Sequence, residues 1–145
     1  MIFRYTILYV EDVPATLAFY EQAFGLTRSF LHDTGDFGEL ATGETKLAFC
    51  SVALLRQMGK TVSAKAPDIP SSEIAFETTD VAGALARAVA AGAELVQDVE
   101  HMPWGQTTAY VRASEGTFIE ICTAVAPSPN PSSARASAAS SASSS

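Results

Sequence analysis

"YTILYVEDVPATLAFYEQAFG", residues 5–25, reads as a strand that leads directly into a helix. Its first six residues are apolar, β-branched or aromatic, which is typical of a strand. Asp12 then stands where a side chain would cap a helix N-terminus, and Val13, Leu17 and Phe24 share one helical face. Gly25 follows, and glycine commonly ends helices. The stretch therefore predicts a strand, a capped amphipathic helix and a glycine stop.

The same pattern returns in "EIAFETTDVAGALARAVAAG", residues 73–92. Asp80 follows Asp12 by 68 residues, and Leu85 follows Leu17 by the same interval. The closing glycines also match, after a slip of one residue. A repeat of this kind indicates that one structural unit occurs twice in the chain.

The carboxyl-terminal ends of the two segments repeat as well. "TGETKLAFCS", residues 42–51, and "SEGTFIEICT", residues 114–123, each contain a glycine turn followed by a strand. Another strand candidate precedes each turn, "FGELAT" at 37–42 and "QTTAYVRA" at 106–113. The unit is therefore strand, helix and then about three strands. Two such βαβββ modules predict an α+β fold.

Composition divides the chain further. We predict one domain over residues 1–125, with module one at 1–51, a linker at 52–72 and module two at 73–125. The linker opens with a possible helical turn and contains Pro67 and Pro70, which favour irregular structure. Residues 126–145 are rich in Ser, Ala and Pro and predict a disordered tail.

Charge and hydropathy narrow the possible partners. The 145-residue chain has a formal net charge of −7 and lacks a Lys/Arg cluster, so neither nucleic acid nor an anionic membrane is an expected partner. Arg4 interrupts the apolar start, which is also too short for a secretory signal or a membrane span. We place the protein in the cytoplasm. Cys50 and Cys122 are expected to be buried free thiols, with a disulfide as the alternative.

The doubled unit, with "YVEDVPATLAFYEQAFGL" after the first strand and "PWGQTTAYVRASEGTFIEIC" near the end, resembles the vicinal oxygen chelate superfamily. That superfamily includes glyoxalase I, bleomycin and fosfomycin resistance proteins, and extradiol dioxygenases. The resemblance covers about residues 2–123. It implies an incomplete barrel around a ligand cavity, a small-molecule ligand and a homodimer.

The resemblance also implies four metal-ligand positions, which are Tyr5, Ala48, Glu73 and Glu120 in this chain. Ala48 cannot coordinate an ion, and the phenol of Tyr5 is a poor ligand because its pKa is near 10. Two carboxylates remain, whereas a catalytic ion typically needs three protein ligands. His32 and His101 could contribute, but both lie in loop-like sequence. We therefore expect no complete catalytic metal site, with a divalent metal held by Glu73 and Glu120 as the alternative.

Glu120 lies in the middle of the strand "GTFIEICT". Alternation puts Phe118, Glu120 and Cys122 on one face of that strand. We expect Glu73 on a neighbouring strand, where the two carboxylates would raise each other's pKa and one could act as a general base or a hydrogen-bond donor. In the alternative, both are hydrogen-bonded to Tyr5, Thr108 or water and line a wet cavity.

Five further side chains are candidates for binding a ligand. Trp104 lies on a predicted turn and could stack on a planar molecule or pack as a lid. Tyr110 and Arg112 share a strand face, and Arg112 could bind a carboxylate or phosphate or could instead pair with Glu115 or solvent. The remaining two, Tyr5 and Tyr9, alternate along the first strand.

Two functions follow from these features. The first is a protein that binds a small molecule in its cavity and leaves it unchanged, as bleomycin resistance proteins do. The alternative is a metal-dependent, glyoxalase-like lyase or isomerase, or a dioxygenase, in which Glu73 or Glu120 moves a proton. The missing metal ligands favour the first.

Overall fold

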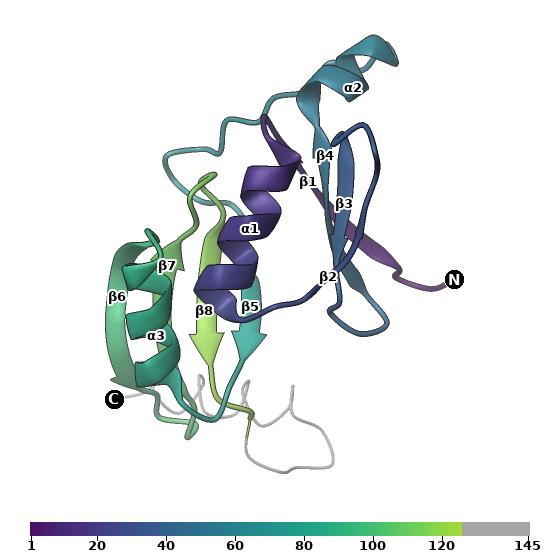
Figure 1. Ribbon diagram of the computed structural model, residues 1–145. Helices are drawn as coiled ribbons and strands as arrows, with labels where there is room; N and C mark the ends of the chain where they lie inside the picture. The colour runs from purple at the N-terminus through teal and green to yellow at the C-terminus, as the bar shows by residue number, and fades with distance from the viewer. Residues whose placement is uncertain (126–145) are drawn as a thin grey trace.

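The computed structural model describes residues 1–125 (Figure 1). The predicted disordered tail, 126–145, lies outside these described residues. The elements are β1 (Tyr5–Val10), α1 (Val13–Phe24), β2 (Arg28–Leu31), β3 (Phe37–Leu40), β4 (Lys46–Ser51), α2 (Val52–Gln57), β5 (Ile74–Glu77), α3 (Val81–Ala90), β6 (Glu94–His101), β7 (Thr107–Arg112) and β8 (Phe118–Cys122).

Both long helices begin at the predicted aspartates. Asp12 Oδ1 accepts a hydrogen bond from the Ala15 N–H at 3.1 Å, and Asp80 Oδ1 accepts one from the Gly83 N–H at 2.9 Å. These bonds satisfy N–H groups that have no partner within the helix. Helix α1 ends at Gly25 in the left-handed region, as predicted. Helix α3 is already capped by its alanine at 91, one residue before the predicted glycine.

The strands form two four-stranded mixed sheets with the same topology. Sheet 1 has the order β1-β4-β3-β2, and sheet 2 has the order β5-β8-β7-β6. In each sheet the first strand pairs in parallel with the last strand of its module, and the other pairs are antiparallel. The predicted pair of βαβββ modules is therefore confirmed. The linker supplies a short helix, α2, between them.

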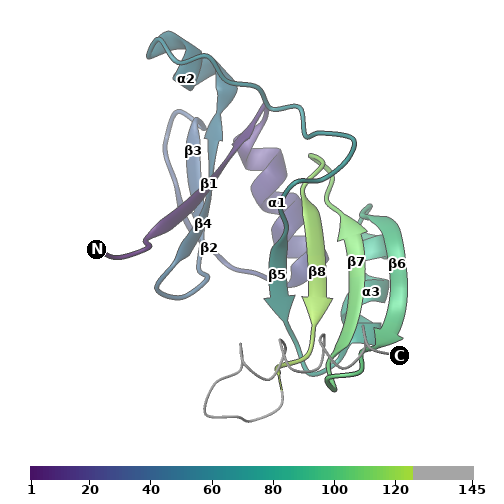
Figure 2. The same ribbon diagram turned by 180° about the vertical axis from the view of Figure 1, so that it is seen from behind.

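The two sheets stand apart, with α1 between them (Figures 1 and 2). Strand β1 is an edge of sheet 1 and β5 is an edge of sheet 2, and within residues 1–125 these edges are not paired with each other. The sheets are therefore not closed into a barrel. The resemblance implied an incomplete barrel, and the described arrangement is an open one.

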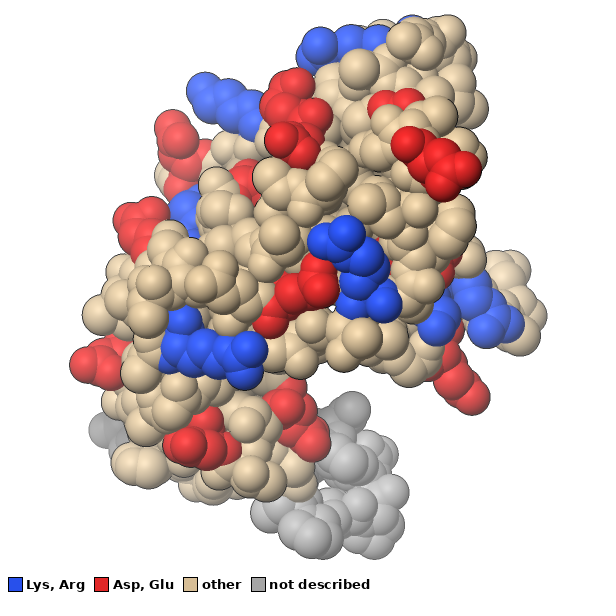
Figure 3. Space-filling view, in the orientation of Figure 1, with Lys and Arg blue, Asp and Glu red and all other residues tan. Residues whose placement is uncertain are grey.

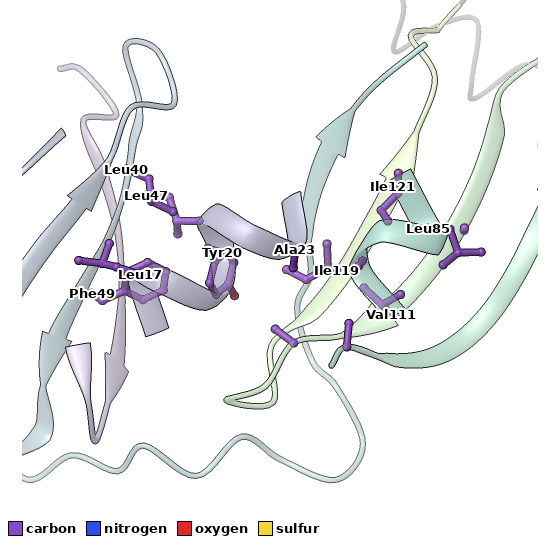
Figure 4. Packing of buried hydrophobic residues seen from close by; sticks show 14 of the residues in the cluster. Leu17, Tyr20, Ala23, Leu40, Leu47, Phe49, Leu85, Val111, Ile119 and Ile121 are labelled. Carbon is purple, nitrogen blue, oxygen red and sulfur yellow. The ribbon is translucent and has the colours of Figure 1, made fainter. Parts of the chain in front are cut away.

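One hydrophobic cluster draws on both modules (Figure 4). Tyr20 of α1 is fully buried, with its ring 5.0 Å from that of Phe49 in sheet 1 and 6.5 Å from that of Phe76 in sheet 2. Aromatic rings at these separations add packing energy to the apolar area that they bury. Helix α1 thus supplies core to both sheets.

Two polar contacts also join the modules. The Tyr20 hydroxyl donates to Glu115 Oε1 at 2.6 Å, and Arg87 Nε of α3 donates to the Gln22 carbonyl at the end of α1 at 2.8 Å. Burial, together with the charge and hydrogen bond of Glu115, raises the pKa of Tyr20 well above its ordinary value. The phenol therefore stays protonated and serves as a donor.

Cys50 and Cys122 are both buried thiols and are not joined in a disulfide, as expected. They lie on β4 and β8, which belong to different sheets. Burial and the nearby carboxylate of Asp36 raise the pKa of the Cys50 thiol.

Among the helices of residues 1–125, none has the length and apolar character needed to cross a bilayer.

Candidate functional site

Sheet 2 has one face packed against α3 and one face turned away from it. Ile119 and Ile121 of β8 belong to the hydrophobic cluster on the helix side. Strict alternation then places Phe118, Glu120 and Cys122 on the opposite face, as the sequence predicts. We call this second surface the open face of sheet 2. Figure 2 views the molecule from the side opposite α3.

Strand register arranges the open face in rows. The central row contains Ala75 of β5, Glu120 of β8, Tyr110 of β7 and Gln97 of β6, because each is the register partner of the next. Partners in register share a face, so these side chains are neighbours across the sheet. The register therefore places Tyr110, which the sequence offered as a candidate ligand-binding residue, on the same face as Glu120.

Two further rows flank the central one. Towards the β7–β8 turn, Phe118 is the partner of Arg112. Towards the other end, Cys122 is the partner of both Glu77 and Thr108. Thr108 is in turn the partner of Glu100 on β6, which completes the third row.

Glu120 is buried, with 3% of its surface exposed. Its Oε2 accepts a hydrogen bond from the Tyr110 hydroxyl at 2.5 Å. Tyr5 and Thr108, the protein partners considered in the alternative, do not bind it: Tyr5 lies on the other sheet, and the antiparallel register puts Tyr110 directly opposite Glu120. One hydrogen bond leaves most of the accepting capacity of a carboxylate unused.

Two polar side-chain atoms on sheet 2 are buried and have no hydrogen-bond partner within residues 1–125. They are Thr108 Oγ1 and Gln97 Nε2. Buried polar groups nearly always have a partner, so each such atom calls for a specific explanation. Both residues share rows with the residues described above, which concentrates unmet hydrogen-bonding capacity around Tyr110 and Glu120.

An aromatic pair lies beside this polar cluster. The rings of Tyr110 and Phe118 are stacked, with centroids 5.0 Å apart and planes inclined by 13°. They line a shallow cavity of about 430 Å³, together with Glu73, Val96 and two residues of the linker. The stacked rings cover each other's inner faces, so a planar molecule would stack on an outer face of this partly exposed pair, next to the buried polar atoms.

Glu73 lies one residue before β5 and is exposed. Continuing the parallel register of Ala75 and Glu120 by two residues places Glu73 beside Phe118. Glu73 and Glu120 are therefore diagonal neighbours, with Cα atoms roughly 8 Å apart on ideal strand spacings. Glu73 also lines a second cavity of about 290 Å³ between β1 and the linker.

Of the candidate residues in module one, only some lie near this region of sheet 2. Tyr9 lines the same second cavity as Glu73 and Phe118. Tyr5 is 44% exposed on the edge strand of sheet 1 and lines neither of the two cavities. Ala48 is fully buried, and its register partner is Ile7 on β1. The structure thus brings Tyr9 towards the site but leaves Tyr5 and Ala48 on sheet 1.

Arg112 is held by backbone carbonyls. Its Nη1 donates to Pro67 at 3.4 Å and to Gly116 at 3.3 Å, and its Nη2 donates to Asp68 at 3.2 Å. These bonds fasten the linker to the β7–β8 turn. The alternative partner weighed from the sequence, Glu115, instead accepts the hydroxyls of Tyr20 and Thr117.

Trp104 lies on the β6–β7 turn, at the opposite end of sheet 2 from Arg112. Its Nε1 donates to Gln106 Oε1 at 2.6 Å, and Gln106 Nε2 donates to the Thr123 carbonyl at 2.8 Å, just beyond β8.

The two histidines are exposed and hydrogen-bonded locally, His32 to Thr34 and His101 to Thr107.

The family positions for a metal are spread over this geometry. Tyr5 and Ala48 belong to sheet 1, whereas Glu73 and Glu120 belong to adjacent rows of sheet 2. Within residues 1–125, no three or more His, Cys, Asp or Glu side chains are grouped so that they could hold an ion.

Three residues of the candidate site were not selected from the sequence. Phe118 could have been, because alternation alone places it on the face of Glu120. Thr108 was considered only as a possible hydrogen-bond partner of Glu120, because its place on another strand depends on the register. Gln97 could not have been selected, because β6 is irregular on both sides of it and these irregularities shift its register against β7. Nothing in the residue types of β6 indicates where such shifts occur.

Comparison with known proteins places this fold in context. The profile of the Glyoxalase/Bleomycin resistance protein/Dioxygenase superfamily matches residues 2–121. A search of curated proteins finds no match.

Solved structures give the same picture. A glyoxalase-related enzyme from Fulvimarina pelagi is 26% identical, with a TM-score of 0.72 over 83% of this chain and 86% of that one. A protein of unknown function from Agrobacterium tumefaciens str. C58 is 27% identical, with a TM-score of 0.70 over 86% and 95%. A glyoxalase/bleomycin resistance protein/dioxygenase from Nocardioides is 22% identical, with a TM-score of 0.70 over 90% and 88%, and supports the fold alone.

Proposed function

The chain belongs to the Glyoxalase/Bleomycin resistance protein/Dioxygenase superfamily, and from that premise we propose that it binds a small planar molecule on the open face of sheet 2 without transforming it. The observation that carries the proposal is the buried Glu120–Tyr110 hydrogen bond beside the stacked rings of Tyr110 and Phe118. The rings offer a flat apolar contact, and the carboxylate offers an orienting polar group.

The donor set supports binding over metal-dependent chemistry. Of the four family positions, Ala48 presents a methyl group and Tyr5 a phenol on the far sheet. Glu73 and Glu120 lie in different rows, so the pair offers at most two carboxylates to one ion. A catalytic divalent ion usually has three protein ligands, which these residues do not provide.

A titration with 2-naphthamide, a neutral planar probe, tests the binding proposal. We expect saturable shifts of the backbone amide signals of Tyr110 and Phe118. The Phe118→Leu variant should bind about 3- to 10-fold more weakly, because it loses the aromatic contact. Phe30→Leu is the matched control, since Phe30 is an exposed aromatic on sheet 1. Equal weakening by both variants, or shifts confined to sheet 1, would contradict a site on sheet 2.

The alternative function is a metal-dependent lyase, isomerase or dioxygenase that uses Glu73 and Glu120. One observation favours it: Glu120 is a buried carboxylate with a single hydrogen bond among residues 1–125, at one of the positions that the family resemblance implies for metal ligands. If an ion bound there, it would polarise a substrate oxygen, and Glu73 would be the nearest group able to move a proton.

Metal uptake separates the two functions. After chelation and refilling with nickel, zinc, manganese or iron, we expect the full chain to retain well below one ion. The Glu120→Gln variant should retain the same amount. Stoichiometric uptake by the natural chain, abolished in Glu120→Gln, would establish the alternative.

A homodimer remains part of the proposal. On sheet 1, Tyr5, Ile7 and Tyr9 form an apolar stripe that is 40–44% exposed, and a second copy would bury it. A mass in solution equal to one 15.2 kDa chain would contradict dimerisation.

A further inference from the structure

We propose that the molecule bound on the open face of sheet 2 is a planar cation, a compound whose protonated nitrogen group meets Glu120 and Thr108 while its ring lies against Tyr110 and Phe118. This inference rests on the proposed function and specifies the class of its ligand. It follows from four features of the site, each of which selects for N–H donors or for positive charge.

The first feature is the carboxylate itself. Glu120 is 97% buried and, among the described residues, accepts a hydrogen bond only from Tyr110. An ionised carboxylate can accept about four hydrogen bonds and is costly to bury without them. A ligand N–H that carries positive charge would complete its coordination with a charge-assisted bond.

The second feature is the hydroxyl of Thr108. This side chain is 2% exposed, and its Oγ1 has no hydrogen-bond partner among the described residues. Thr108 precedes Tyr110 by two residues on β7, so it lies on the same face and diagonal to Glu120. A hydroxyl can accept an N–H as well as donate, so Thr108 and Glu120 together fit a group with two N–H donors, such as an amidinium.

The third feature is the aromatic pair. The faces of aromatic rings carry negative electrostatic potential and attract cations. Tyr110 and Phe118 are stacked next to the carboxylate, so a planar cation could contact the rings and the carboxylate at once. A planar anion would meet repulsion from both.

The fourth feature is the local charge. Residues 73–125 contain eight acidic residues and two basic residues. Residues 1–72 also contain eight acidic residues, but they contain six basic ones. Glu77 and Glu100 lie in the row of Thr108, and Glu73 lies beside Phe118. Arg112, the one cation that the described register places on this face, is bonded to three carbonyls of the linker and turn.

The helix side of the molecule differs from this arrangement. Figure 3 shows acidic and basic side chains interspersed over that side, with no large area of one sign. On the open face, by contrast, each of the three rows contains an acidic residue, in keeping with the excess of negative charge in module two. Such a surface raises the local concentration of cations and the rate at which they associate.

Three probes that share a naphthalene ring test the inference. They are 2-naphthamidine, a cation, 2-naphthamide, which is neutral, and 2-naphthoate, an anion. We expect the amidine to bind the full chain about ten-fold more tightly than the amide, which corresponds to about 1.4 kcal/mol, and the naphthoate to bind most weakly. Added salt should reduce the preference for the amidine, because exposed charges are screened.

Variants assign the preference to the site. Glu120→Gln keeps an acceptor for Tyr110 but removes the charge, and it should abolish most of the preference for the amidine. Glu44→Gln removes the same charge from an exposed turn of sheet 1 and should leave the preference intact. Thr108→Val should weaken binding of the amidine, whereas Thr108→Ser should preserve it.

The outcomes distinguish this inference from the proposed function. If the three probes shift the Tyr110 and Phe118 amides with equal affinity, the ligand is planar but not cationic, and the inference is overturned while the proposed function stands. If none of the probes shifts those amides, both fail. A preference for the amidine that Glu44→Gln reduces as much as Glu120→Gln would also overturn the inference, because it would reflect net charge alone.

Discussion

Replacing Tyr20 by alanine is expected to lower the free energy of unfolding by about 3–5 kcal/mol. The side chain is fully buried and contacts Phe49 of one sheet and Phe76 of the other. Its removal leaves a cavity at the point where both modules share core, and it removes the donor to Glu115. Urea denaturation followed by circular dichroism measures the loss.

A phenylalanine at the same position separates packing from hydrogen bonding. Tyr20→Phe keeps the ring and removes only the hydroxyl, so the expected loss is about 1–2 kcal/mol. Tyr9→Phe is the control, because Tyr9 is 40% exposed and should change stability by less than about 0.5 kcal/mol. A Tyr20→Phe protein as stable as the natural one would show that the bond to Glu115 contributes nothing.

The hydrogen bond between Tyr20 and Glu115 should also make the free energy of unfolding depend on pH. The pKa of Tyr20 lies well above its ordinary value of 10.0 in the folded chain, because of burial and Glu115. Above about pH 10 the unfolded chain therefore binds fewer protons than the folded chain, and the free energy of unfolding falls as pH rises. Tyr20→Phe lacks this dependence. The difference in stability between the two proteins should narrow above pH 10 and stay constant below it.

Replacing Gly116 by alanine is the second substitution with a large expected effect. The residue has a φ of +101°, which disfavours any side chain, and an added Cβ would lie 2.5 Å from the Cβ of Ala66 in the linker. Backbone strain and the clash together should cost about 2–5 kcal/mol. Thermal and urea unfolding of the purified variant measure this cost.

A glycine in the corresponding turn of module one provides the control. Gly43 has a similar φ of +94°, but an added Cβ there would meet nothing within 4 Å. Gly43→Ala should therefore report backbone strain alone, about 1–3 kcal/mol. The excess cost of Gly116→Ala measures the contact between the β7–β8 turn and the linker. Equal costs would mean that this contact is absent in solution.

Much of the fold could be predicted from local patterns. Asp12 and Asp80 cap their helices, and Gly25 ends α1, because capping depends only on residues a few positions apart. The face of Glu120 was also predictable, since alternation along a strand requires no knowledge of its neighbours. The internal repeat then indicated that the unit occurs twice, and the two sheets do share one strand order.

The partners of the site residues could not be predicted in this way. Glu120 binds Tyr110 because β7 and β8 are aligned in one particular register, which the packing of the whole sheet determines. Arg112 binds carbonyls of a linker that lies about 45 residues earlier, so no short pattern reveals the contact. The separation of the two sheets likewise depends on how α1 fills the space between them.

The β7–β8 hairpin carries Glu120 and Tyr110 in its middle, and its turn lies against the first half of the chain, through Tyr20 and the linker. The duplicated halves are consequently no longer interchangeable. A fragment that contains only module two would retain every acid and ring of the candidate site. It would lose the contacts with Tyr20 and the linker that hold the hairpin in place. Substitutions in module one are therefore constrained by the need to keep the candidate site of module two in place.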